Sequence, residues 1–367
     1  MISAAIFPGR YIQGQDSLKL LGKEIRRLGD NAMLICSPSS VKTIIPKYSE
    51  FIEKYLKFQV KQFNRETTDE EISSLTESAK KSQCNIIAGI GGGKTLDTAK
   101  AVANNLKLPV AIVPTIASTD APTSAISVVY TKEGVFDKVL TLDKNPDIVL
   151  IDSKIIAEAP ERFLVSGMGD ALATYFEAES CRQKCANNFA GYQGLLTAYA
   201  IAKLCYQTLL EYGELSKIAC KNNVVTPALD HIIEANTLLS GIGFESCGIA
   251  AAHSIHNGLT ALPQTRKYFH GEKVAFGLLV SLFLTDKPKS VIDELYYFCR
   301  KIGLPVCLKD IGLENAADCD LMKIAEKSCA KCELIINEPS PVTPESVFNS
   351  IKIADAYGKM NISGNIS

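Results

Sequence analysis

Three of the four histidines of this chain, His253, His256 and His270, lie within eighteen residues of one another. Imidazole is the commonest metal ligand in proteins and titrates near neutral pH, so the cluster indicates a metal or acid–base site. A catalytic zinc takes three protein ligands and leaves a fourth position for water or substrate. His253 and His270 are the better pair of ligands, because on a helix His256 would share a face with His253. From there His256 could reach the substrate or cofactor without binding the metal.

A carboxylate would complete such a metal site. Asp170, which ends the run Gly-Met-Gly-Asp, supplies one at what the pattern predicts to be the start of a helix. The spacing alone cannot pair Asp170 with the histidines. The fourth histidine, His231, lies in a separate helical stretch and is interpreted as structural or exposed.

A glycine-rich turn, Gly91 to Gly93, follows an apolar run and precedes a helical pattern. Such a turn lets the backbone approach a pyrophosphate and points free N–H groups and the helix dipole at it. The Rossmann fingerprint fits imperfectly, because Lys94 takes the place of its third glycine. A P-loop is the second interpretation, in which Lys94 would bind the phosphates and Thr95 the Mg²⁺. Ala88 stands where that motif has its first glycine, and a P-loop would leave the histidines unexplained. A tight turn without a ligand is the third interpretation.

A polar loop from Pro114 to Ala125 follows the next predicted strand. Open α/β sheets bind ligands at the carboxyl ends of their strands, where this loop would lie. Its hydroxyl groups could hold a phosphate or a ribose, and Asp120 could orient a polyol or pass a proton. An ordinary Ser/Thr-rich connection is the alternative.

The elements that must position these residues divide the chain in two. Apolar runs at 32–36, 58–63, 85–90, 109–114 and 146–152 alternate with helical patterns, which predicts an α/β Rossmann-like domain with a parallel sheet at 1–162. A hairpin around Lys132 to Gly134 is expected at the edge of that sheet. A helix is expected to begin after Thr68, with Glu71 as its capping-box partner. Apolar spacing near 3.6 then predicts an all-α domain at 163–367, with the active site in the interdomain cleft.

The composition excludes several classes of protein. A net charge of −1 over 367 residues gives no reason to expect nucleic-acid or membrane partners. No apolar run reaches the roughly 18 residues of a membrane helix, and the N-terminus lacks signal-peptide features, so a cytoplasmic protein is expected. The twelve scattered cysteines are expected to be reduced and mostly buried. Cys329 and Cys332 form the only C-x-x-C, which is a poor metal or redox signal.

Six segments together resemble the iron-containing (group III) alcohol dehydrogenases, and in particular the glycerol-oxidising members of that family. They follow the family's order and span most of the chain: 7–14, 89–97, 114–124, 167–171, 252–258 and 270–273. The resemblance implies hydride transfer from a vicinal diol, glycerol giving dihydroxyacetone, to a nicotinamide cofactor, NAD with NADP as the alternative. It also implies a metal ion, Zn²⁺ with Fe²⁺ as the alternative, and a homo-oligomer, often an octamer.

By motif position, the resemblance implies that Asp170, His253 and His270 bind the metal. Asp120 would contact the substrate hydroxyls, and Asp120 or His256 would assist the departure of the proton. The cofactor would lie against Ser37, Gly92, Gly93, Lys94, Asp97, Thr115, Ser118, Ser124, Ile126 and Tyr130.

Ser37 departs from the family's pattern. NAD-using members usually carry an Asp just after the second strand, where it grips the adenosine ribose. Without that carboxylate a 2′-phosphate is not repelled, although no Arg replaces it and Lys42 is the nearest cation. NAD is still favoured, and tolerance of NADP follows as the alternative.

Three other functions stay open. A reductase of 2-oxo acids, a hydroxycarboxylate dehydrogenase, would use the same site, and a substrate panel would separate the two. The 3-dehydroquinate synthases and glycerol-1-phosphate dehydrogenases share the architecture but bind phosphorylated substrates, and the only cations near the histidines are Arg266, Lys267 and Lys273. A P-loop nucleotide-binding protein would bind Mg²⁺-ATP and tolerate the loss of His270.

Overall fold

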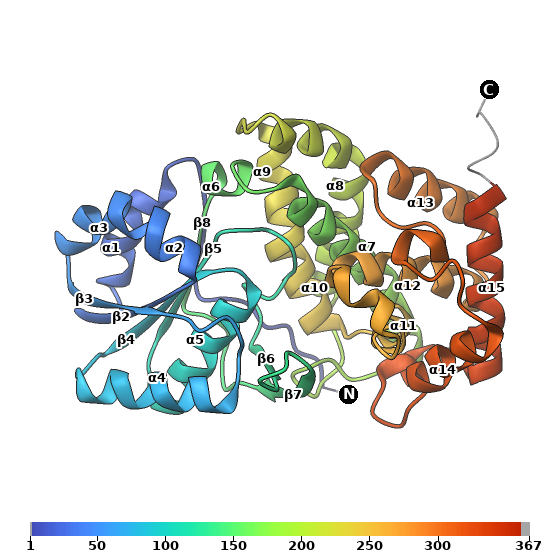
Figure 1. Ribbon diagram of the computed structural model, residues 1–367, viewed down its shortest axis with the longest axis horizontal. Helices are drawn as coiled ribbons and strands as arrows, with labels where there is room; N and C mark the ends of the chain where they lie inside the picture. Colours follow the sequence, from blue (N-terminus) through green and yellow to red (C-terminus); the bar gives the residue numbers. More distant parts are fainter. Residues whose placement is uncertain (1, 361–367) are drawn as a thin grey trace. The chain divides into compact units, whose positions relative to one another are not determined.

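The computed structural model describes residues 2–360 of the chain (Figure 1). Contacts within the chain define two compact units. The α/β unit comprises Phe7–Leu164 and Ile218–Gly241, and the helical unit comprises the residues up to Ile6, Val165–Lys217 and those from Ile242 onward. The domain limits 1–162 and 163–367 stay a prediction. The contacts group 218–241, which follows the predicted boundary, with the α/β unit.

Six parallel strands form the sheet of the α/β unit, in the order β1-β8-β5-β4-β2-β3. The central strands are apolar and buried, as strands covered on both faces must be. The predicted parallel α/β fold is confirmed, whereas β1 was not predicted because its four residues carry no apolar run. The strands are β1 (Tyr11–Gly14), β2 (Asn31–Cys36), β3 (Lys57–Gln62), β4 (Ile86–Gly91), β5 (Val110–Pro114) and β8 (Ile148–Asp152).

Helices cover both faces of this sheet (Figure 1). On one face lie α1 (Leu21–Ile25), α2 (Pro38–Thr43) and α3 (Ile45–Glu53), and on the other lie α4 (Asp69–Lys81) and α5 (Gly93–Leu106). The chain reverses its direction across the sheet between the neighbouring strands β2 and β4. Ligands of open α/β sheets bind at such a reversal. Two further helices of this unit are α6 (Ser153–Ala157) and α9 (Pro227–Glu234).

The predicted capping box at the start of α4 is only half formed. Oγ1 of Thr68 accepts a hydrogen bond from the backbone N–H of Glu71 at 3.1 Å, so the predicted N-cap is confirmed. The carboxylate of Glu71, however, accepts from the backbone and the side-chain amide of Asn64, at 3.1 and 2.7 Å. The reciprocal bond is therefore replaced by a tertiary contact that ties the preceding loop to the helix.

The predicted hairpin forms, but not at the edge of the main sheet. Strands β6 (Ile126–Tyr130) and β7 (Phe136–Thr141) pair antiparallel as a separate two-stranded sheet. The backbone N–H of Val128 donates to Oδ2 of Asp97 on α5, and that of Tyr130 donates to the carbonyl of Thr67. These bonds use backbone donors of β6 away from the main sheet, so the edge prediction is wrong.

The described part of the helical unit contains no strand beyond an isolated bridge between Ser3 and Gln193, which confirms the all-α prediction. A core of Ile255, Phe276 and Ile324 with their neighbours lies where α11, α12, α14 and α15 pack together. The helices are α7 (Glu161–Lys184), α8 (Leu196–Lys221), α10 (Ser240–Cys247), α11 (Ala251–Leu259), α12 (His270–Leu284), α13 (Lys289–Ile302), α14 (Asp318–Ser328) and α15 (Pro344–Met360).

Two further predictions concern membrane helices and cysteines in the part of the chain that the structure describes. Among residues 2–360, no helix combines the length and the apolar character needed to cross a membrane. All twelve cysteines fall in this range, all are free, and most are buried, as predicted.

Candidate active site

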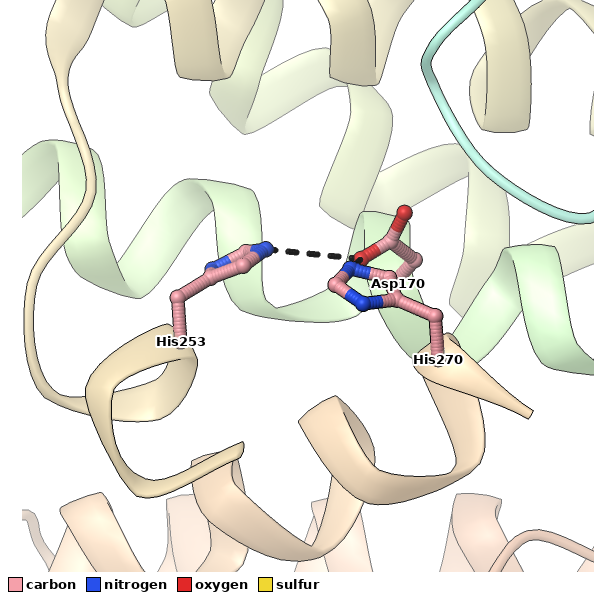
Figure 2. A group of neighbouring side chains, drawn as sticks. All are labelled: Asp170, His253 and His270. Atoms are coloured by element: carbon pink, nitrogen blue, oxygen red, sulfur yellow. Dashed lines mark ion pairs between the residues drawn. The ribbon is translucent and has the colours of Figure 1, made fainter. Parts of the chain in front are cut away.

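Asp170, His253 and His270 converge in the helical unit from α7, α11 and α12 (Figure 2). Nε2 of His270 lies 3.0 Å and Nε2 of His253 lies 3.5 Å from the same oxygen, Oδ1 of Asp170. One potential ligand atom from each side chain lies within 4.8 Å of the others. Ligand atoms bound tetrahedrally to zinc are roughly 3.3–3.5 Å apart, so little movement would bring these three to one ion.

The carboxylate of Asp170 is only 1% exposed, and neither of its oxygens has a hydrogen-bond donor with proper geometry. A buried carboxylate without such partners is costly, and a bound cation removes that cost. Burial alone raises the pKa of Asp170, but His270 and His253 hold that pKa well below its usual range. Burial lowers the pKa of His253, yet Glu177 and Asp170 raise it well above its usual value. These anionic surroundings favour a positive charge, and two imidazoles with a carboxylate are a donor set that fits a divalent metal.

Two glycines allow α7 and α12 to approach closely enough to join Asp170 to His270. A Cβ atom on Gly271 would lie 1.8 Å from the carbonyl oxygen of Ser166 and 2.9 Å from the backbone nitrogen of Asp170. A Cβ atom on Gly169 would lie 2.4 Å from the carbonyl oxygen of Gly271. The prediction of a helix start at Asp170 is wrong, because α7 already begins at Glu161. The glycines there serve helix packing and do not end a helix.

Glu177, two turns after Asp170 on α7, holds His253 in place. Its Oε2 lies 2.6 Å from Nδ1 of His253, and its Oε1 accepts the backbone N–H groups of Ala250 and His253 at 2.9 and 3.0 Å. The carboxylate therefore caps the start of α11 and engages Nδ1 of His253, so that Nε2 is the ring nitrogen that faces Asp170 and could bind a metal. Sequence reasoning missed Glu177, although its spacing of seven from Asp170 places both on one helix face.

His256 lies one turn after His253 on α11 and is only 9% exposed. Its Nδ1 lies 3.0 Å from Oδ1 of Asn257, and its Nε2 lies 3.1 Å from Nδ1 of His270. Burial, together with the charges of His270, Lys273 and His253, lowers the pKa of His256 well below its usual value. In this arrangement both ring nitrogens of His256 are already engaged.

The glycine turn connects β4 to α5 as predicted, with Gly92 as the N-cap of the helix. Ser37 lies beside it at the end of β2, where its backbone N–H donates to the carbonyl of Ile90 at 2.9 Å. The backbone N–H of Thr115 donates to the carbonyl of Gly91 at 3.0 Å. The structure thus brings Ser37, Gly92 and Thr115 together at the reversal point of the sheet.

Lys94, in the first turn of α5, forms an ion pair with Glu66. Its Nζ lies 2.6 and 2.8 Å from the two carboxylate oxygens and 4.5 Å from the ring centroid of Tyr130. Burial, with the charges of Asp97 and Glu66, raises the pKa of Tyr130 to about 12. Two residues predicted to contact the cofactor, Lys94 and Tyr130, therefore pack against each other beside the glycine turn.

A buried lysine that sequence reasoning missed ties this region together. Lys100 on α5 forms an ion pair with Asp97 at 2.9 Å and donates to the carbonyl oxygens of Ala121, Ser124 and Ile126. Burial raises the pKa of Asp97, and Lys100 opposes this effect. Asp97, Ser124 and Ile126 are thus linked to one network that fixes the polar loop, while their contact with a cofactor stays a prediction.

A π-helical turn, η2 (Ala235–Leu239), supports the polar loop that holds Asp120. Asn236 donates to the carbonyl of Ala117 at 3.0 Å, and Thr123 donates to the carbonyl of Thr237 at 2.8 Å. Asp120 itself accepts from the hydroxyl of Ser240 at 2.9 Å. Turns of this kind are frequent at functional sites, but the apolar pattern predicts only a regular helix here. The contacts of Asp120 and Ser118 with a substrate or cofactor stay predictions.

Several known proteins are similar to this chain. Residues 8–153 match the family model described as iron-containing alcohol dehydrogenase. The chain is 56% identical to a glycerol dehydrogenase of Thermotoga maritima, covering 98% of this chain and 99% of the relative, and 46% identical to one of Citrobacter freundii, covering 98% and 99%. The solved structure of a probable glycerol dehydrogenase from Sinorhizobium meliloti 1021 superposes with a TM-score of 0.92 at 40% identity, over 98% of this chain and 100% of that one.

The chain belongs to the iron-containing alcohol dehydrogenase family and is an oxidoreductase. Membership implies a nicotinamide cofactor and a divalent metal ion. The P-loop interpretation of the glycine turn is thereby excluded. Hydroxycarboxylate dehydrogenase A of Escherichia coli is more distant, at 32% identity over 74% of this chain and 75% of the relative.

Proposed function

We propose that this chain is an NAD-dependent glycerol dehydrogenase that oxidises glycerol to dihydroxyacetone at the site of Asp170, His253 and His270. The observation that carries the proposal is the buried carboxylate of Asp170, which faces two imidazole nitrogens and no hydrogen-bond donor of proper geometry. Relatives named glycerol dehydrogenase that are 46% and 56% identical over nearly the whole chain support the choice of substrate.

The chemistry divides between the bound groups and the side chains. A divalent cation held by Asp170, His253 and His270 supplies a Lewis acid that eases ionisation of an alcohol, and the nicotinamide supplies the hydride acceptor. Glu177 occupies Nδ1 of His253, so that Nε2 is the nitrogen that would act as a ligand once a metal displaces its proton. Asp120 is proposed to accept a hydrogen bond from a substrate hydroxyl and so to orient the diol.

The α/β unit is proposed to bind the cofactor at the reversal point of its sheet. Gly92 and Gly93 leave room for the pyrophosphate at the N-terminus of α5. Lys94 carries a positive charge beside this turn and would exchange Glu66 for a phosphate oxygen. Ser37 would lie near the adenosine ribose, because its backbone N–H is bonded to the strand that leads into the turn.

A panel of substrates and cofactors tests the proposal. Absorbance at 340 nm is followed with added Zn²⁺ for NAD and NADP, each with glycerol, 1,2-propanediol and lactate, and in reverse with dihydroxyacetone and 2-oxobutanoate. We expect zinc-dependent turnover of glycerol with NAD and the reverse reaction with dihydroxyacetone. Turnover of 2-oxobutanoate and lactate alone would contradict the proposal and assign a hydroxycarboxylate dehydrogenase. Zinc as the native metal, homo-oligomeric assembly and a cytoplasmic location stay predictions.

A further inference from the structure

Behind His270, on the side away from Asp170, three side chains form a continuous series of hydrogen bonds. Nδ1 of His270 lies 3.1 Å from Nε2 of His256, and Nδ1 of His256 lies 3.0 Å from Oδ1 of Asn257. The amide nitrogen of Asn257 lies 2.9 and 3.2 Å from the two carboxylate oxygens of Glu333. We call Glu333, Asn257 and His256 the outer series.

The outer series allows one assignment of protons when it is read from its carboxylate. A carboxylate only accepts hydrogen bonds, so Asn257 must donate through its nitrogen and accept through its oxygen. His256 must then donate through Nδ1 to that oxygen, and an imidazole with a single N–H there has a bare Nε2. That Nε2 can only accept, so His270 must carry its own proton on Nδ1. The consequence is a bare Nε2 on His270, the atom that lies 3.0 Å from Asp170.

We propose that Glu333, Asn257 and His256 are positioning residues that hold His270 in the tautomer and orientation required of a metal ligand. This inference rests on the proposed function, because it assumes a metal at Asp170, His253 and His270. It gives each histidine ligand a buried or half-buried carboxylate: Glu177 bonds His253 directly, and Glu333 acts on His270 through two intermediates. His256 accordingly takes no part in proton transfer from the substrate.

Two substitutions of His256 distinguish the loss of its hydrogen-bond acceptor from the change in side-chain size. His256→Leu removes the acceptor, whereas His256→Gln keeps an oxygen that can reach Nδ1 of His270. Loss of an outer partner of a metal ligand typically costs about 10–100-fold in metal affinity, and we expect this loss for His256→Leu. His256→Gln should stay much closer to the unsubstituted protein. The dissociation constant for Zn²⁺ is measured on the full chain by competition with a chromogenic chelator.

A second pair tests the far end of the outer series without changing side-chain volume. Glu333→Gln removes the carboxylate that orients Asn257 and should weaken zinc binding. Glu326→Gln removes the same charge from an exposed position on α14 and should not. Visible spectra of the Co²⁺-loaded proteins report ligand geometry independently of activity, and we expect them to change for Glu333→Gln and His256→Leu only. Glu333→Gln keeps the test decisive if His256→Leu does not fold.

Activity at saturating zinc distinguishes positioning from catalysis. Because His256 touches no substrate in this account, kcat of His256→Leu should recover most of its loss once zinc is saturating. Unchanged zinc affinity and an unchanged Co²⁺ spectrum in both His256→Leu and Glu333→Gln would overturn the inference. So would a loss in His256→Gln as large as in His256→Leu, or a low kcat that zinc does not restore. If the unsubstituted protein bound no zinc, the proposed function itself would fail, and the two failures are therefore distinguishable.

Discussion

At the scale of single residues, the histidines of the proposed metal site stood out in the sequence because the chain uses histidine so rarely. Three of its four histidines fall in one short segment, helical spacing favoured His253 and His270 among them, and only the family resemblance joined Asp170 to them. The supporting residues gave no such signal. Glu177 and Glu333 are two among many acidic residues, and only the packing of α7 and the segment before η5 (Leu334–Asn337) against α11 brings them to the histidines. Spacing could have placed Glu177 on the helix face of Asp170, but the contacts of both glutamates with the histidines arise from tertiary structure.

Ser37 allows a test of cofactor choice that leaves the fold intact. Its hydroxyl caps α2 by accepting from the backbone N–H of Ser40 at 3.2 Å, and Asp and Asn are equally good caps. Ser37→Asp would place a carboxylate where it repels a 2′-phosphate. We expect kcat/KM with NADP to fall by about tenfold or more, roughly 1.4 kcal/mol, while that with NAD is kept or improved.

Ser37→Asn is the matched control, since it has the same shape without the charge. It should leave the ratio of the two kcat/KM values close to that of the unsubstituted protein. If Ser37→Asp changed that ratio no more than Ser37→Asn does, Ser37 would not lie near the ribose.

At the scale of elements, the apolar pattern predicted strands and helices correctly wherever the local sequence and the tertiary packing favour the same structure. The buried strands β2, β4, β5 and β8 lie within a residue or two of their predicted positions. The exceptions have tertiary causes. The hairpin β6–β7 forms a sheet of its own, and the backbone of β6 is hydrogen-bonded to Asp97 on α5. The π-helical turn Ala235–Leu239 lies within a segment whose apolar residues have ordinary helical spacing. Neither the hydrogen bond from Val128 to Asp97 nor the single π-helical turn could be recognised in the apolar pattern.

The glycine turn lends itself to a prediction that separates folding from cofactor binding. A Cβ atom on Gly93 would meet nothing closer than Oγ1 of Thr119 at 3.9 Å, so Gly93→Ala should change the free energy of unfolding by no more than about 0.5–1 kcal/mol. The same methyl group would occupy the space proposed for the pyrophosphate. We expect KM for NAD to rise by about tenfold or more.

Gly89→Ala, in the strand that leads into the same turn, should instead lower the stability of the fold. Its Cβ atom would lie 2.7 Å from Cβ of Ala99, where β4 packs on α5. Overpacking of this kind costs about 1–3 kcal/mol, which denaturant unfolding would detect. A Gly93→Ala protein that bound NAD as tightly as the unsubstituted protein would refute the proposed position of the pyrophosphate.

At the scale of the whole molecule, the metal should couple stability to activity. An ion that binds the folded state alone stabilises it by about 2.7 kcal/mol at a free concentration one hundred times its dissociation constant. Asp170, His253 and His270 lie on α7, α11 and α12, so removing the ion leaves a buried carboxylate without a hydrogen-bond donor where the three helices meet. A chelator should therefore lower Tm by several degrees, and added Zn²⁺ should restore it.

Titration of the metal-free protein shows whether a catalytic metal binds at Asp170, His253 and His270. Zn²⁺ is added in substoichiometric steps while bound zinc and glycerol-dependent NADH formation are measured on the same samples. We predict no turnover without metal, a linear rise to one zinc per chain and then a plateau. His270→Ala should bind zinc more than about 100-fold more weakly and stay inactive, because it lacks a direct ligand. Full turnover by metal-free protein, or by His270→Ala, would contradict the account.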